Sequence, residues 1–228
     1  MATFSSPLEI HIAVRNELDK TQDFQYADFQ PEQIDYWINK AYELWIDETA
    51  YPMAQQKLPF EYNQKRIDEL RELVKSDEGT ATQNLSEFVI KLPNDYRHLV
   101  RHECVTKLND ITKTVPGVQT KLDYINLQKK DPFWIPTNNN PLFYITGDSI
   151  VYETKGDFDV VSNKIQYIKN PIHLKLGSEY TDPEEDVYWE ITNQFAIYQI
   201  INRCVQMMLE NIESPRYQTN LNEYNKTN

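Results

Sequence analysis

Glycine is scarce in this chain of 228 residues, which contains only five. It has no Gly-rich phosphate loop and no GxSxG motif, and no nucleophile stands beside a base at a recognisable spacing. The sequence therefore predicts neither enzymatic activity nor a bound cofactor.

Cysteine and long apolar runs are also lacking. Cys104 and Cys204 form neither a CxxC pair nor a disulfide framework, which predicts two reduced cysteines in a cytosolic compartment. No apolar segment reaches the roughly 18 residues that a membrane span needs. The first residues also lack the basic and apolar regions of a signal peptide, so we expect neither export nor membrane insertion.

Clusters of basic residues are missing as well. The chain has 23 basic and 35 acidic residues, which gives a net charge of −12. This charge would repel a phosphate backbone, so we expect no sequence-specific binding of nucleic acid. The same charge suits the wall of a channel through which DNA slides without being held.

Two histidines near the middle of the chain raise the question of a metal site. If residues 97–107 were helical, His98 and His102 would share one face beside Glu103 and Cys104. A strand would destroy that geometry, HExxH is absent, and no second ligand pair stands at a zinc spacing. The sequence therefore favours solvated or hydrogen-bonded histidines and no metal.

The longest helical pattern in the chain covers residues 180–217. Apolar residues recur there at spacings of three and four, as on one face of a helix. Thr181 or Asp182 can act as the N-cap before Pro183, with acidic residues at the positive end of the helix dipole, and Pro215 marks a stop. We expect one helix over residues 183–212.

Three further helices are predicted nearer the N-terminus, over residues 7–19, 31–48 and 61–75. Residues 76–84 follow them and contain no apolar side chain larger than alanine. We expect this polar segment to form a mobile loop.

Strands are expected in the middle of the chain, with a Gly-Asp turn marking one hairpin. The predicted strands cover residues 86–92, 142–145, 149–153 and 164–169. Residues 100–108 fit a strand or a short helix, and the pattern does not decide between them. Residues 109–141 contain several prolines and predict an irregular excursion, with one or two helical turns around 121–129.

Together these elements predict an α+β fold: a helical bundle of three N-terminal helices and one long C-terminal helix, with a small antiparallel β-sheet insertion. Residues 1–84 would form the N-terminal part of the bundle, and residues 85–176 the β-rich insertion with its irregular loop. Residues 177–213 would complete the bundle, and residues 214–228 would be a flexible tail that binds a partner.

Aromatic residues are abundant, with 15 Tyr, 9 Phe and 4 Trp. Tyrosine is favoured at contact surfaces because it buries area with little loss of rotamer entropy and keeps a polar tip in water. A tyrosine-rich core and an extensive protein–protein interface both account for this composition, and the sequence leaves both open.

Four stretches in this order resemble a known kind of structural protein: FQPEQIDYWINKAYELWI, VIKLPNDYRHLVR, KIQYIKNPIHL and WEITNQFAIYQIINRCVQMMLENIESPRYQTNLNE. They are similar to the head-to-tail ring or adaptor (neck) proteins of short-tailed, crAss-like phages that infect Bacteroides. The similarity spans most of the chain, with residues 76–84 and 109–141 outside it. It is a similarity of pattern, without a catalytic signature.

The resemblance implies a structural virion protein of the neck, assembled in the host cytoplasm. It implies a homo-oligomeric, dodecameric ring that binds the portal protein, contacts other neck or tail rings and lines the DNA passage. The helical bundle would form the ring, residues 142–169 would reach toward the next ring, and residues 214–228 would lie along the portal. The residues expected to contact the portal are Arg216, Tyr217, Gln218, Leu221, Glu223 and Tyr224.

Two alternatives from other classes stay open. The chain could be another phage component, such as a tail-completion or scaffold-associated protein. A metal-dependent or small-molecule enzyme is the remoter alternative, and only the histidine pair speaks for it.

Overall fold

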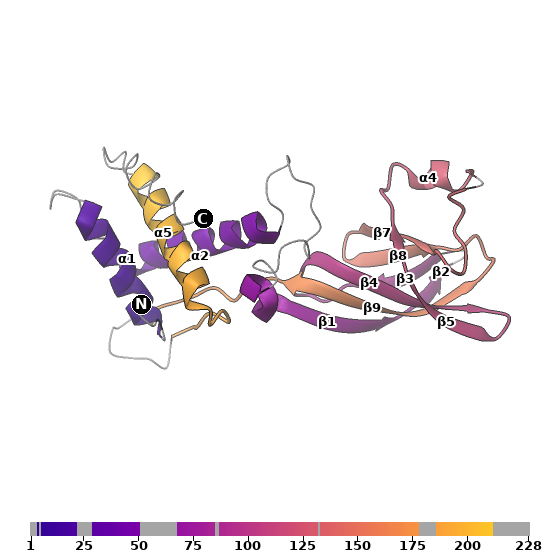
Figure 1. Cartoon of the computed structure of the whole chain (residues 1–228), viewed down its shortest axis with the longest axis horizontal. Helices are drawn as coiled ribbons and strands as arrows, with labels where there is room; N and C mark the ends of the chain where they lie inside the picture. The colour runs from indigo at the N-terminus through magenta and orange to yellow at the C-terminus, as the bar shows by residue number, and fades with distance from the viewer. Residues whose placement is uncertain are drawn as a thin grey trace. The chain divides into compact units, whose positions relative to one another are not determined.

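A computed structural model describes residues 4, 6–21, 29–50, 68–84, 87–131, 133–177 and 186–211. Contacts between residues divide the chain into two compact units (Figure 1). A helical unit contains Met1–Leu73 and Pro171–Asn228, and a strand unit contains Val74–Asn170. The strand unit is thus inserted between the two parts of the helical unit.

Three helices pack together in the helical unit: α1 (Pro7–Thr21), α2 (Pro31–Ala50) and α5 (Gln194–Asn211). At the start of α1, the Ser6 N–H donates to Glu9 Oε2 at 3.2 Å and the Glu9 N–H donates to Ser6 Oγ at 3.3 Å. This reciprocal capping box satisfies two N–H groups that a helix start leaves unpaired. Helices α1 and α2 begin where the sequence predicts and end two residues later than predicted.

Polar contacts fix how α2 and α5 face each other inside an apolar interface. The indole N–H of Trp45 donates to Gln199 Oε1 at 2.8 Å, and Arg203 pairs with Glu48 at 2.8 Å. The residues around them are apolar and buried, and include Ile34, Ile38, Tyr42, Ile197, Ile200, Ile201, Cys204, Val205 and Met208. This core excludes water from the Trp45–Gln199 hydrogen bond, which strengthens it.

The predicted long helix over residues 183–212 is wrong at its start. Helix α5 begins only at Gln194, because the Asn193 side chain accepts the Phe195 N–H at 3.0 Å and the Ala196 N–H at 3.4 Å, as a helix N-cap does. Before it the chain is extended, and Val187 forms an antiparallel bridge with Lys175. Residues 178–185 lie outside the described part.

The predicted third helix is wrong at its end, and the predicted loop after it is wrong. Residues 68–70 are helical, Arg71–Leu73 forms the short 3-10 helix η2, and strand β1 starts at Val74, while residues 61–67 lie outside the described part. Residues 76–84, expected to be a mobile loop, belong to strands β1 and β2. Their polarity reflects solvent-exposed edge strands, in which most side chains face water.

The architecture is therefore α+β with two sheets of four and five strands, and the predicted bundle of three N-terminal helices and one long C-terminal helix is wrong. The strands are β1 (Val74–Thr80), β2 (Thr82–Asn84), β3 (Glu87–Lys91), β4 (Tyr96–Leu108), β5 (Ile111–Pro116), β6 (Val118–Gln119), β7 (Leu142–Thr146), β8 (Ser149–Glu153) and β9 (Asp159–Lys169). Most of them lie where the sequence left a loop, an undecided element or an excursion.

The first sheet has the order β1-β9-β4-β5 and the second β2-β3-β8-β7-β6 (Figure 1). Every pairing is antiparallel except that of β6 with β7. The predicted hairpin is confirmed as β7–β8, with Gly147 at φ +56° in its turn. Residues 100–108, which the sequence left undecided, form part of β4.

Both sheets contribute to one core. Its buried residues are Phe88, Ile90, Cys104, Phe143, Ile150, Tyr152, Phe158, Val160, Ile165 and Tyr167. Burial raises the pKa of the Cys104 thiol to about 12, so this cysteine stays protonated at neutral pH.

Gly117, between β5 and β6, is expected to tolerate no side chain. A Cβ added there would lie 2.5 Å from His102 Cε1 and 2.8 Å from Phe143 Cδ1, and those two rings are stacked with centroids 4.0 Å apart. We expect Gly117→Ala to lower the free energy of unfolding by about 1–3 kcal/mol, measured by urea denaturation, because the stacked rings must move.

The matched control for this substitution is Gly156→Asn. Gly156 has φ +81° and no atom within 4 Å of an added Cβ, and asparagine tolerates this backbone conformation. Equal stability of Gly117→Ala and the wild type would contradict the packing described around His102.

Candidate interaction surface

The histidine pair does not form a metal nest. Both residues lie in strand β4, where His102 points into the core and is hydrogen-bonded to the Tyr152 hydroxyl. Burial lowers the pKa of His102 to about 4, so its imidazole is neutral at pH 7. Within the described ranges, no group of three His, Cys, Asp or Glu side chains could hold a metal ion.

The excursion over residues 109–141 is more ordered than the sequence predicts. Strands β5 and β6 occupy its first part, and the expected helical turn is confirmed as α4 (Ile125–Gln128). The Thr120 hydroxyl donates to the Gln128 side chain, which ties the start of the excursion to the end of α4.

An ion pair just after α4 anchors this segment to β8 of the five-stranded sheet; Figure 1 labels α4 and β8. Alternate residues of β8 point to opposite faces, so Val151 and Glu153 point away from the core that contains Tyr152. Both are nonetheless buried, and Glu153, which is 2% exposed, forms an ion pair with Lys129 just after α4. Ile125 is buried as well, so the excursion covers this face of β8.

Five large apolar side chains within residues 122–134 are exposed to water. We call this group the α4 patch; it consists of Leu122, Tyr124, Leu127, Phe133 and Trp134. Phe133 is 93% exposed and Leu127 is 66% exposed. Single exposed apolar residues are ordinary, but a group gathered on one short anchored segment marks an interaction site.

Charged side chains gather where Lys129 of the excursion meets β8. Glu87 on β3 lies directly opposite Glu153 on β8. Burial raises the pKa of Glu87, the charge of Glu153 and a hydrogen bond with it raise this pKa further, and Lys129 opposes the rise. Burial together with the two carboxylates also raises the pKa of Tyr144 on β7. Lys129 therefore offsets repulsion between two carboxylates while it holds the excursion in place.

Sequence reasoning missed the α4 patch. The six residues predicted to contact the portal all lie outside the described part: Arg216, Tyr217, Gln218, Leu221, Glu223 and Tyr224. The α4 patch and the predicted tail are therefore independent candidates for a contact. Within the described part, no helix is long and apolar enough to cross a membrane.

Comparison with known protein families finds no match for this chain, and comparison with curated proteins finds none either.

Stability is expected to depend on pH through Glu87. Because folding raises its pKa, the folded chain binds more protons than the unfolded chain just above the ordinary glutamate range, so stability falls as the pH rises through that window. In Glu87→Gln we expect a shallower fall and a free energy of unfolding about 0.2–1 kcal/mol higher at neutral pH, as for the relief of like charges on facing strands. Urea denaturation across the acidic to neutral range measures both.

The control is Asp123→Asn, which removes a carboxylate from an exposed position near α4. This variant should keep the pH dependence of the wild type. A Glu87→Gln protein with the full pH dependence would show that the Glu87–Glu153 pair does not set it.

Proposed function

We propose that this chain is a structural virion protein, a head-to-tail connector that joins the portal of a tailed phage to its tail and surrounds the DNA passage. The observation that carries the proposal is the α4 patch, a group of large apolar side chains held in water by an anchored segment. Such a surface is expected of a subunit that is complete only within an assembly.

The four stretches that resemble neck proteins support the proposal from the sequence. Their described residues include most of α2, parts of β3, β4 and β9, and the whole of α5, and these elements contribute buried residues to both units. A net charge of −12 supports it too, since an acidic wall lets DNA pass without binding it.

The parts of the connector are assigned differently from the sequence prediction. A ring built on a four-helix bundle is not proposed, because the described residues form two sheets with nine strands in all, and α5 begins only at Gln194 instead of at residue 183. We assign contact with an adjoining virion component to the α4 patch of the strand unit. The portal protein is the first candidate for that component, and another neck or tail protein is the second.

The experiment that tests this function uses the full chain and its Phe133→Ser/Trp134→Ser variant. Both are tested for binding to the portal protein and to the neck and tail proteins encoded in the same genome. We expect the wild type to bind one of them and the variant to bind at least about tenfold more weakly, because exposed aromatic side chains that become buried dominate interface energies.

Ile12→Ser/Ile172→Ser is the matched control, since it removes two half-exposed apolar side chains from the helical unit. It should bind like the wild type. A wild-type chain that binds none of these proteins would contradict the connector function, and undiminished binding by the patch variant would remove the patch from the contact.

A further inference from the structure

We propose that strand β5 of one copy of this chain pairs with strand β1 of the next copy, so that the four-stranded sheets of neighbouring subunits join edge to edge. The inference rests on the proposed connector function only in requiring several copies side by side. It names the interface between them, which neither the α4 patch nor the resemblance identifies.

The two edges of the four-stranded sheet have compatible directions. Strands β1 and β5 are its outer strands, and β9 and β4 lie between them. All three pairings are antiparallel, so β1 and β5 run in opposite directions. If β5 is placed beside β1 of another copy, the new pair is antiparallel as well, and the alternation continues from subunit to subunit.

The backbone of β1 presents alternate residues to a partner. The Ala81 N–H donates to the Val161 carbonyl at 2.9 Å, so the pair Ala81–Val161 is hydrogen-bonded across to β9. Hydrogen-bonded pairs alternate along an antiparallel ladder, so Gly79 and Asp77 also direct their backbone groups to β9. The backbone N–H and C=O groups of Ser76 and Glu78 therefore point outward, away from the sheet.

The backbone of β5 has the matching alternation. A two-residue turn, Asn109-Asp110, with φ values of +49° and +64°, closes the β4–β5 hairpin between Leu108 and Ile111. The closing pair of such a turn is hydrogen-bonded, so Ile111 and Lys113 direct their backbone groups to β4. Those of Thr112 and Thr114 point outward, ready to pair with a strand like β1.

The faces on which the side chains of β1 and β5 lie agree with this alternation of the backbone groups. On β1, Asp77 lies opposite the buried Ile165 and so points toward the core face. On β5, Lys113 lies opposite the buried Thr106 and points toward the same face. A register that places Asp77 and Lys113 on the same face therefore also sets the outward-pointing N–H and C=O groups of β1 opposite those of β5.

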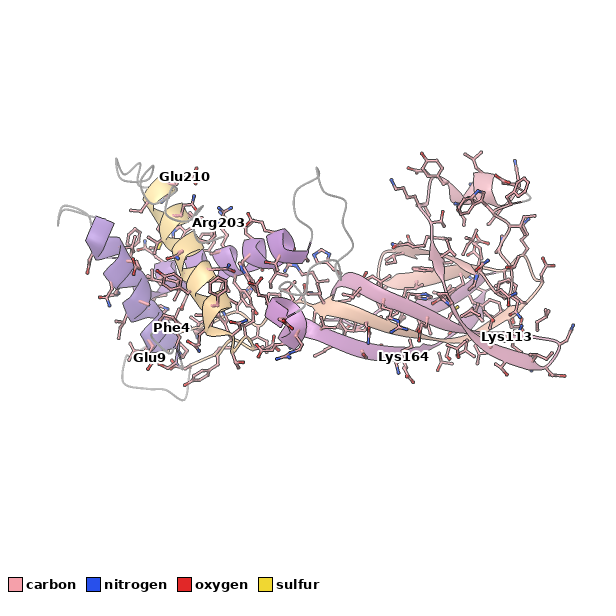
Figure 2. The ribbon with its side chains drawn as sticks, viewed as in Figure 1. Phe4, Glu9, Lys113, Lys164, Arg203 and Glu210 are labelled. Carbon is pink, nitrogen blue, oxygen red and sulfur yellow. The ribbon has the colours of Figure 1, made fainter. Side chains whose placement is uncertain are left out.

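Several registers between β5 and β1 match the outward-pointing backbone groups, and charge and shape favour one of them. Placing Lys113, labelled in Figure 2, opposite Asp77 pairs opposite charges. Glu78 already pairs with Lys164 of its own sheet at 3.1 Å. The same register sets Ile111, 60% exposed, opposite Gly79. Gly79 borders a cavity of about 660 Å³ that Val89 and Ile90 also line. All of β5 then faces residues 74–79 of β1.

The five-stranded sheet offers poorer edges. Its outer strands β2 and β6 have three and two residues, too short for a ladder of this length. Open edge strands invite pairing with another chain unless they are covered. A β5–β1 contact uses a different surface at each side of the subunit, the type of interface that closes into rings when the rotation allows.

The test is oxidative cross-linking of full-length Asp77→Cys/Lys113→Cys, alone and bound to the portal protein. We expect a ladder of disulfide-linked multimers on non-reducing gels, since facing residues of an antiparallel pair lie within disulfide reach. The native Cys104 and Cys204 are buried with raised thiol pKa values, so they contribute no background.

Asp77→Cys/Thr112→Cys is the matched control, because Thr112 points to the opposite face of the sheet. It should form no ladder. A second measurement keeps the test valid if the cysteine variants fold poorly: by analytical ultracentrifugation, Lys113→Asp should weaken self-association by about fivefold, and the swap Asp77→Lys/Lys113→Asp should restore it. Lys155→Asp, the same charge change on the β8–β9 turn, should have no effect.

The outcomes separate this inference from the proposed function. A wild-type ring that binds the portal protein but gives no ladder, and no rescue by the charge swap, overturns the β5–β1 interface and leaves the connector function standing. A wild-type chain that stays monomeric with and without the portal protein overturns both. A ladder without portal binding supports the interface and counts against the connector.

Discussion

The pairing of β9 with β4 on one side, from Asp159 to Lys169, and with β1 on the other, from Ser162 to Ile168, is the contact on which the strand unit depends. Ile165 and Tyr167 of β9 point into the core shared by both sheets, and the side chain of Asn163 accepts the Gly79 N–H at 3.1 Å. This ladder also fixes β1 and β5 as the sheet edges. The interface proposed between copies is thus a consequence of how β9 is placed.

On the five-stranded sheet, a buried carboxylate determines how the excursion is held. Covering β8 buries Glu153, and a buried carboxylate needs a partner, which Lys129 supplies from the excursion. With the excursion held by this ion pair, the strand unit does not bury all of the apolar side chains of the excursion. Phe133 and Trp134 are left in water, and a partner is the remaining means of covering them.

Local signals in the sequence predict some elements well. Pro31 and the turn at Gly147 place α2 and the β7–β8 hairpin, because proline and glycine restrict or permit backbone conformations that few other residues adopt. The sequence predicts a loop over residues 76–84 because exposed edge strands have the composition of a loop, and only pairing with β9 and β3 makes these residues strands. The start of α5 depends on the Asn193 cap, which competes with an equally plausible start at Pro183. Exposure at the α4 patch could not be predicted, because it depends on which face of α4 meets the distant β8.

We propose that this chain acts as one of several identical subunits on a phage portal. Native mass spectrometry of the full-length chain, alone and mixed with the portal protein encoded in the same genome, is the decisive measurement. We expect a defined complex with about one copy of this chain per portal subunit, as when matched rings dock. A chain that stays monomeric and does not bind the portal protein would refute the proposal.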